Sequence, residues 1–283
     1  MTAPADEAPL LALLDLPGVR EAVDTARDAC TQLRWHEALR RRVPEAAAES
    51  RVRGAQANAA LDGAELPVDI VRDLVRGARP WPEQPDPIEQ VVRGAVQASA
   101  ETEALRTLVL RAPVQALARL HTAAAAGLLP PEQVGRPRQG AESCREFVDL
   151  GTAPAAAELP ARLAGVAGLV GLAGRVPVVL VAAIVHAEIC QLRPFVRGNG
   201  VVARALERLV VQAAGLDPTG VAVPEAGHLA GGGVAYLGAL TAYGTGTAPG
   251  VGLWLRQAAA AHVAGAAEGR RIADAVLVGR LTS

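Results

Sequence analysis

The chain has 283 residues, and its 28 arginines, without any lysine, are balanced by 29 acidic residues, so that the formal net charge is −1. A nearly neutral chain offers no electrostatic argument for DNA, RNA or an anionic membrane as a partner. The 51% share of hydrophobic residues excludes disorder along the whole chain, because disordered segments combine low hydrophobicity with high charge. With 2% aromatic residues, a base-stacking surface for single-stranded nucleic acid is not expected either.

The cysteines and the apolar segments indicate a soluble, cytoplasmic protein. Cys30, Cys144 and Cys190 are odd in number and far apart, which argues against a disulfide framework and a zinc site. Residues 1–21 are acidic before a short apolar run and do not fit a signal peptide. The longest apolar run, Val176–Val185, is about half as long as the roughly 20 residues that a membrane helix needs. We therefore expect reduced thiols and no membrane or nucleic acid as a partner.

The predicted elements of the first part are helices. Apolar residues recur at spacings of three and four along most of the chain, which predicts a mostly α fold. One or two amphipathic helices are expected over residues 16–43. Pro44 is suited to the start of the next helix, which should end at the turn formed by Asp62 and Gly63.

A proline-rich segment divides the chain. Residues 79–87, RPWPEQPDP, are too rich in proline for a helix interior and are the best candidate for a linker. We expect an N-terminal helical region over residues 1–87 and a core over residues 88–283. Helices should resume over residues 88–121, followed by a loop over residues 128–140.

The second part contains one short extended candidate among helices. Residues 141–150, around EFVDL, are the only plausible extended piece. The most apolar helix is expected from Pro177 to Leu192, and a glycine-bearing loop should separate it from a helix over Val201–Ala214. Closing helices are expected around Trp254 and Arg270.

The segment His186–Arg204, HAEICQLRPFVRGNGVVAR, has the features of an anion-binding site. It places a buried helix, a Pro-Phe turn, a Gly-Asn-Gly loop and a new helix in immediate succession. Gly198 and Gly200 allow the backbone to approach a ligand closely. The first N–H groups of the next helix are unpaired, and the helix dipole favours negative charge there.

The same segment resembles, in constant register and without gaps, the motif of the Fic family, H-x-x-F-x-x-I-H-P-F-x-(D/E)-G-N-G-R-x-x-R. The matching residues are His186, Pro194, Phe195, Gly198, Asn199, Gly200 and Arg204. Weaker matches lie at residues 117–121, 135–138 and 236–243, so that the resemblance covers roughly residues 50–270. It implies an all-α helical core with a small β-hairpin flap. It also implies the transfer of AMP from ATP to a hydroxyl side chain of a target protein.

This sequence departs from the motif where that chemistry takes place. The motif histidine, which is the general base in the family, is Arg193 here, and arginine cannot be deprotonated in proteins. The motif acid, which holds magnesium in the family, is Arg197, and a guanidinium repels Mg²⁺. The first arginine after Gly-Asn-Gly is Val201, which removes a phosphate contact. We therefore expect neither ordinary AMP transfer nor bound Mg²⁺.

The histidines of the chain offer no obvious substitute for the base. His186 lies seven residues before Arg193, about two helical turns or ~10 Å along the axis, and we interpret it as a packed helix histidine. His121, His228 and His262 have no sequence neighbours that indicate a triad or a metal site. We expect structural roles for all of them and assign no metal ligand.

The two replacement arginines suggest a different use of the loop. Arg193 and Arg197 add positive charge near a helix N-terminus, and guanidinium groups pair with phosphate in a bidentate manner. Our hypothesis is a site for ATP, another nucleotide or phosphate that needs no metal. It would use these two arginines, the amides of Gly198–Gly200 around Asn199, and Arg204. The alternative is a relic loop that carries two solvated arginines.

A segment before the core resembles the inhibitory helix of many Fic proteins, (S/T)-x-x-x-E-(G/N). In the family its glutamate pairs with the arginine that ends the motif and obstructs the γ-phosphate of ATP. Here the match is Asn58–Gly63, within a segment over about residues 45–63, and Asp62 replaces the glutamate. The resemblance predicts a partly buried ion pair between Asp62 and Arg204. The alternative is that Asp62 is an exposed residue at a helix end.

Three functions remain open at this point. The first is a catalytically degenerate Fic protein that binds a nucleotide, a phosphate or a protein partner. The second is an active nucleotidyl (AMP) transferase with an unconventional base, in which Arg193 and Arg197 stabilise transition-state charge. The third is a structural helical scaffold. Neither a target protein nor the oligomeric state follows from the sequence.

Overall fold

The computed structural model describes residues 7–146 and 150–280, and these form twelve α-helices, four short 3₁₀ helices and no β-strand. The mostly α fold class is therefore confirmed for the described residues. The β-hairpin flap is not shown, since the described part of residues 128–150 is loop apart from a 3₁₀ turn over Pro131–Gln133. Residues 147–149, in the EFVDL segment expected to be extended, lie outside the described residues.

Local sequence signals explain where many of the helices start. Proline stands in the first or second position of seven of the twelve, where its missing N–H costs no helical hydrogen bond. Asp86 and Glu89 form a capping box at the start of α5. The helices are α1 (Ala8–Ala12), α2 (Val19–Arg34), α3 (Val43–Leu61), α4 (Val68–Arg76), α5 (Pro87–Val109), α6 (Pro113–Ala125), α7 (Leu159–Val170), α8 (Val178–Leu192), α9 (Asn199–Ala213), α10 (Pro224–Ala230), α11 (Gly233–Gly244) and α12 (Ala248–Leu277).

Most predicted helix limits agree with the structure, and two differ for local reasons. The helix expected from residue 88 to residue 121 is two helices, α5 and α6. Proline at position 113 cannot continue a helix, and Ala112 before it has left the helical region with φ −142° and ψ 69°. Helix α9 starts two residues earlier than expected, because Gly198 takes a φ of 86° at its N-cap.

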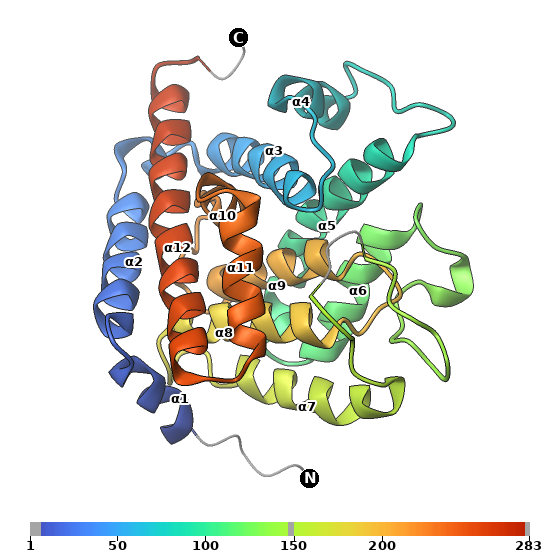
Figure 1. Cartoon of the computed structure of the whole chain (residues 1–283). Helices are drawn as coiled ribbons and strands as arrows, with labels where there is room; N and C mark the ends of the chain where they lie inside the picture. Colours follow the sequence, from blue (N-terminus) through green and yellow to red (C-terminus); the bar gives the residue numbers. More distant parts are fainter. Residues whose placement is uncertain (1–6, 147–149, 281–283) are drawn as a thin grey trace.

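Helices α8 and α9 pack against each other in the centre of the molecule (Figure 1). Nearly all residues of α8 are buried, as expected of a helix that is apolar on every side. Helices α5 and α6 cover α9, and α12 packs on α8 together with α11. No helix of the described residues is both long enough and apolar enough to span a membrane.

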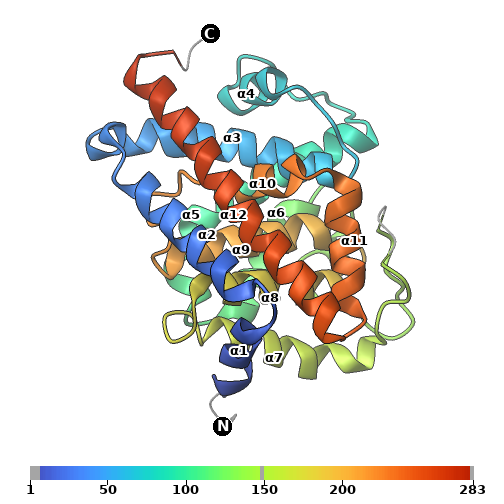
Figure 2. The same ribbon diagram turned by 60° about the vertical axis from the view of Figure 1, so that its left-hand side comes forward.

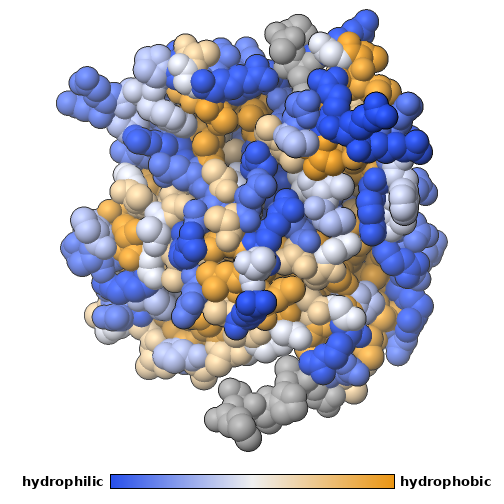
Figure 3. All heavy atoms as spheres, turned by 180° about the vertical axis from the view of Figure 1, so that it is seen from behind, coloured by the Kyte–Doolittle hydropathy of each residue, from blue (hydrophilic) through white to orange (hydrophobic). Residues whose placement is uncertain are grey.

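The N-terminal helices are attached to this core along its length. Helix α3 packs on α5, α10 and α12, and α2 lies beside α12 although the two are distant in sequence (Figures 1 and 2). Residues 79–86 join α4 to α5 without helical structure. Seen from the side opposite to Figure 1, hydrophobic and hydrophilic residues intermingle on the surface (Figure 3).

Candidate functional site

The connection between α8 and α9 has an unusual backbone. Arg193 follows the last residue of α8 with a φ of 43°, and it is the one non-glycine residue with positive φ in the described part of the chain. Its carbonyl oxygen accepts a hydrogen bond of 2.9 Å from Nε of Arg138. Further backbone bonds tie the amides of Arg138 and Arg145 to the carbonyls of Pro194 and Val196. The loop over residues 136–146 is thereby held against the start of α9.

Asn199 and His121 brace this loop from inside. Asn199 accepts a hydrogen bond of 2.8 Å from the amide of Phe195 and donates one of 2.9 Å to its carbonyl. The His121 ring stacks on Phe195 with centroids 3.7 Å apart. Its Nδ1 accepts from the amide of Gly135, so that Nε2 carries the proton and donates to the carbonyl of Arg197 at 3.1 Å. Burial lowers the pKa of His121 to about 4, which fits a neutral structural ring.

A carboxylate already occupies the start of α9. Oε1 of Glu146 accepts a hydrogen bond of 2.7 Å from the amide of Asn199 and another from its side-chain nitrogen. A helix N-terminus favours an anion in this position. Burial, and then the charge of Asp62, raise the pKa of Glu146 above its ordinary value. Our sequence analysis did not single out this residue, which it saw only as part of an extended piece.

A second carboxylate occupies the other anion position, at Arg204. The Arg204 guanidinium is 1% exposed and donates to Asp62, whose side chain is 13% exposed. It also donates to Oδ1 of Asn58 at 2.6 Å and to the hydroxyl of Tyr236 at 3.0 Å. A Cβ atom on Gly200 would lie 2.6 Å from Oδ1 of Asp62, so glycine is needed for this approach. The predicted ion pair is therefore present, whereas its inhibitory role stays a prediction.

These groups line a small, partly open cavity of about 30 Å³. Asp62, Glu146, Arg193, Arg204 and Tyr236 are among the residues that line it. The volume has room for about one water molecule, so a nucleotide does not fit unless the carboxylates move. The structure thus brings together most of the residues that the sequence analysis selected.

The two replacement arginines have different positions. Arg193 is 6% exposed, lines the cavity and donates to the carbonyl of Gly151 at 2.7 Å, while its buried Nε has no hydrogen-bond partner. Arg197 is half-buried and is not among the residues that line the cavity. Nε of Arg193 is therefore a guanidinium donor at the cavity wall that is available to a ligand.

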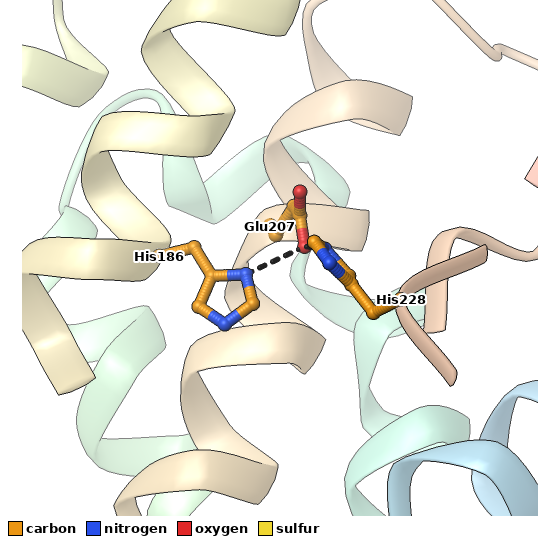
Figure 4. Close-up of side chains that lie close together, drawn as sticks. All are labelled: His186, Glu207 and His228. Atoms are coloured by element: carbon orange, nitrogen blue, oxygen red, sulfur yellow. Dashed lines mark hydrogen bonds and ion pairs between the residues drawn. The ribbon is translucent and has the colours of Figure 1, made fainter. Parts of the chain in front are cut away.

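Behind the cavity, three of the five histidines of the chain meet at Glu207, two of which, His186 and His228, are drawn in Figure 4. Nδ1 of His186 and Nε2 of His228 each lie 2.8 Å from its Oε2, and Nε2 of His262 lies 3.1 Å from its Oε1. All four side chains are at most 1% exposed. His186 is a packed helix histidine, as expected, but the sequence analysis missed this cluster. Its members come from four helices, and spacings of 21 and 34 residues correspond to no helical or metal-binding pattern.

Comparison with known proteins identifies the fold and a partial match to one sequence family. The sequence model of the Fic/DOC family matches residues 111–211, which include α6, α8 and most of α9. No curated protein matches the chain. Among solved structures, a Fic family protein from Desulfovibrio desulfuricans has a TM-score of 0.71 at 19% identity, covering 100% of this chain and 79% of its own. Fic-1 (residues 134–508) from C. elegans has a TM-score of 0.65 at 17% identity, covering 96% and 76%.

A Fic-domain signalling protein from Bacteroides thetaiotaomicron is similar as well, with a TM-score of 0.62 at 13% identity, covering 89% of this chain and 98% of its own. These identities are low, so the structures bear on the fold and not on the activity. The family match rests on the segment that carries the motif and forms the α8–α9 junction. The chain therefore has a Fic-type helical fold, and its residues 111–211 match the model of the Fic/DOC family.

Proposed function

We propose that this chain is a Fic-domain protein that does not transfer AMP and instead binds a phosphate-bearing nucleotide without metal at the α8–α9 junction. The observation that carries the proposal is the pair of internal carboxylates in the two anion positions. The Glu146 carboxylate is bound at the N-terminus of α9, and the Asp62 carboxylate is paired with the Arg204 guanidinium. Both positions are therefore able to hold an anion, and a ligand phosphate would replace these carboxylates.

The residues around the cavity support binding better than catalysis. Arg193 is always charged and cannot accept the proton of a target hydroxyl. Burial raises the pKa of the Cys190 thiol to about 12, and burial also holds the pKa of Tyr236 well above its ordinary value. Asp62 and Glu146 are the described carboxyl groups that line the cavity, and each is bound at an anion position. None of these groups is placed as a free general base.

Ligand binding would compete with contacts inside the protein. The phosphate must displace Glu146 from the amide of Asn199 and Asp62 from Arg204, and the cavity must open from about 30 Å³. Removing either carboxylate should therefore increase affinity. Arg193, with its unpartnered Nε at the cavity wall, would supply the charge that replaces a metal ion.

Isothermal titration calorimetry with ATP, ADP and AMP, first in EDTA and then in Mg²⁺, tests the proposal. Glu146→Gln and Asp62→Asn should each bind at least about tenfold more tightly than the wild type, a gain of ~1.4 kcal/mol, and equally well in EDTA. Glu65→Gln, an exposed neighbour of Asp62, is the matched control and should bind as the wild type does. Arg193→Gln should lose binding, while Arg197→Ala tests whether the second arginine takes part.

Two results would reject the proposal in different ways. If neither the wild type nor any variant binds a nucleotide, the functions that remain are a structural scaffold and the binding of a protein partner. Transfer of labelled AMP from ATP to a protein hydroxyl would establish the active-transferase alternative. In that case the loss of transfer in Glu146→Gln or Asp62→Asn would identify the unconventional base.

A further inference from the structure

The His186, Glu207, His228 and His262 side chains form a polar cluster in the hydrophobic centre of the molecule. They come from α8, α9, α10 and α12, and each is at most 1% exposed. Figure 4 shows His186 and His228 pointing toward the Glu207 carboxylate from different helices. Four polar side chains in a core cost free energy unless each finds a partner there.

Hydrogen bonds within the cluster do not satisfy all of its atoms. Oε2 of Glu207 is bonded by both His186 and His228. Oε1 of Glu207 and Nε2 of His262 face each other at 3.1 Å, yet neither has a hydrogen-bond partner of acceptable geometry. Nδ1 of His228 and Nδ1 of His262 are unpartnered as well. An unpaired buried polar atom is expensive, so a ligand that contacted both Oε1 of Glu207 and Nε2 of His262 would lower this cost, whereas the two Nδ1 atoms would stay without a partner.

We infer that these four residues form a buried binding site for one zinc-type divalent cation. The ligands would be Nδ1 of His186, Nε2 of His228, Nε2 of His262 and the carboxylate of Glu207. Three imidazole nitrogens and one carboxylate are a donor set that suits Zn²⁺ in tetrahedral coordination. The site is separate from the cavity at Arg204 and does not rest on the function proposed above.

The donor atoms of three of the four residues are spaced almost as this ion requires. Those of His186, Glu207 and His228 lie within 4.8 Å of one another. Zinc–ligand distances of about 2.0–2.2 Å place tetrahedral ligand atoms about 3.4 Å apart. Nδ1 of His186 and Nε2 of His228, each 2.8 Å from Oε2 of Glu207, therefore need to move away from it by about half an ångström. His262 lies outside this group of three and would have to move toward it to become the fourth ligand.

The surroundings hold the ligands in place. The remaining nitrogen of His186, Nε2, lies 2.7 Å from the hydroxyl of Tyr236, a partner that can accept its proton and leave Nδ1 free to coordinate. The His228 ring stacks on Trp254 with an interplanar angle of 2°, and Trp254 is itself fixed by a hydrogen bond to the carbonyl of Ala183. The cation would join α8, α9, α10 and α12 at one point.

Metal analysis of untagged wild-type protein, purified with added Zn²⁺ and then exhaustively desalted, decides the question. We expect one equivalent of zinc per chain by plasma mass spectrometry. We also expect the visible absorption of tetrahedral Co²⁺ when the protein is refolded with Co²⁺, and a lower Tm after removal of zinc with a chelator under mildly denaturing conditions. His262→Gln and His228→Gln should lose the zinc equivalent, whereas the control His36→Gln, half-buried beside Asp274 and outside the cluster, should retain it.

The opposite results would overturn the inference. A wild-type protein without stoichiometric zinc, without the Co²⁺ absorption and with the same Tm in Zn²⁺ and in chelator contains a metal-free hydrogen-bonded cluster. Because these measurements use the wild type, they hold even if a variant fails to fold. Retention of one zinc by both His262→Gln and His228→Gln would also contradict the assignment of ligands.

Discussion

Replacing Asp62 by alanine removes the one carboxylate that is hydrogen-bonded to the buried Arg204 guanidinium among the described residues. Removal of one partner of a buried ion pair costs about 3–5 kcal/mol, because the other charge stays in the core. Two features of the structure reduce this cost. Arg204 keeps its hydrogen bonds to Asn58 and Tyr236, and Asp62 itself is 13% exposed. The loss of Asp62 also relieves its repulsion of Glu146.

We therefore expect Asp62→Ala to lower the free energy of unfolding by about 2–3 kcal/mol at pH 7. This is slightly less than the ~3–5 kcal/mol that removal of one partner of a fully buried ion pair costs. For a chain of this length the corresponding decrease in Tm is about 5–10 °C. Urea unfolding followed by far-UV circular dichroism measures the first quantity, and a thermal scan measures the second. Asp62→Asn keeps a hydrogen-bond acceptor and should lose about half as much.

The control and the double variant separate the ion pair from other effects. Glu65→Ala, at an exposed position in the same loop, should change stability by less than about 0.5 kcal/mol. Adding Arg204→Met to Asp62→Ala removes the uncompensated charge and should recover part of the loss. If Asp62→Ala is no less stable than Glu65→Ala, the buried pair does not stabilise the fold and our reasoning is wrong.

Three further predictions concern the groups around the site. Burial lowers the pKa of His121 from 6.5 to about 4 in the folded protein. The stability that depends on its neutral ring is therefore complete above pH 6.5 and is lost as the pH falls toward 4. The slope of the free energy of unfolding against pH should therefore be smaller in His121→Gln than in the wild type, by at most about 1.4 kcal/mol per pH unit, in denaturation measured at several pH values. Equal slopes in the two proteins would contradict this. Tyr236→Phe removes the hydroxyl shared by Arg204 and His186 and should cost about 1–3 kcal/mol in urea unfolding; an unchanged midpoint would show that the hydroxyl is dispensable. Gly227→Ala would place Cβ 1.8 Å from a backbone oxygen of α12, so we expect poor soluble expression or a loss above about 3 kcal/mol, and wild-type stability would exclude this close packing.

The helices and the Fic-like motif could be predicted from the sequence because their determinants are local. Pro44 and the turn at Asp62 and Gly63 set the limits of α3 to within one or two residues. The apolar run that starts at Val176 became the buried α8 for the same reason. A helix start depends on a few consecutive residues and their backbone preferences, so it needs no knowledge of the fold. The motif from His186 to Arg204 is likewise a continuous segment, which is why its register could be aligned.

The substitutions at Arg193 and Arg197 could also be found in the sequence, since the absence of a base follows from residue type alone. The positions of these two side chains relative to the cavity could not be predicted from the sequence. The structure places Arg193 at the cavity and does not place Arg197 there, because the direction of each side chain depends on the φ of 43° at Arg193 and on the packing of the loop.

Only the tertiary structure brought Glu146 to the start of α9 and three histidines to Glu207. Glu146 lies 53 residues from Asn199, in a loop without a recognisable pattern. The three histidines that contact Glu207 come from three other helices. Contacts of this kind depend on how helices pack, which is determined by the fit of whole apolar faces and not by the spacing of the polar residues they carry. The sequence by itself thus determined the helices, the resemblance to the Fic motif and the missing base. The folded core decided which charges meet in its interior.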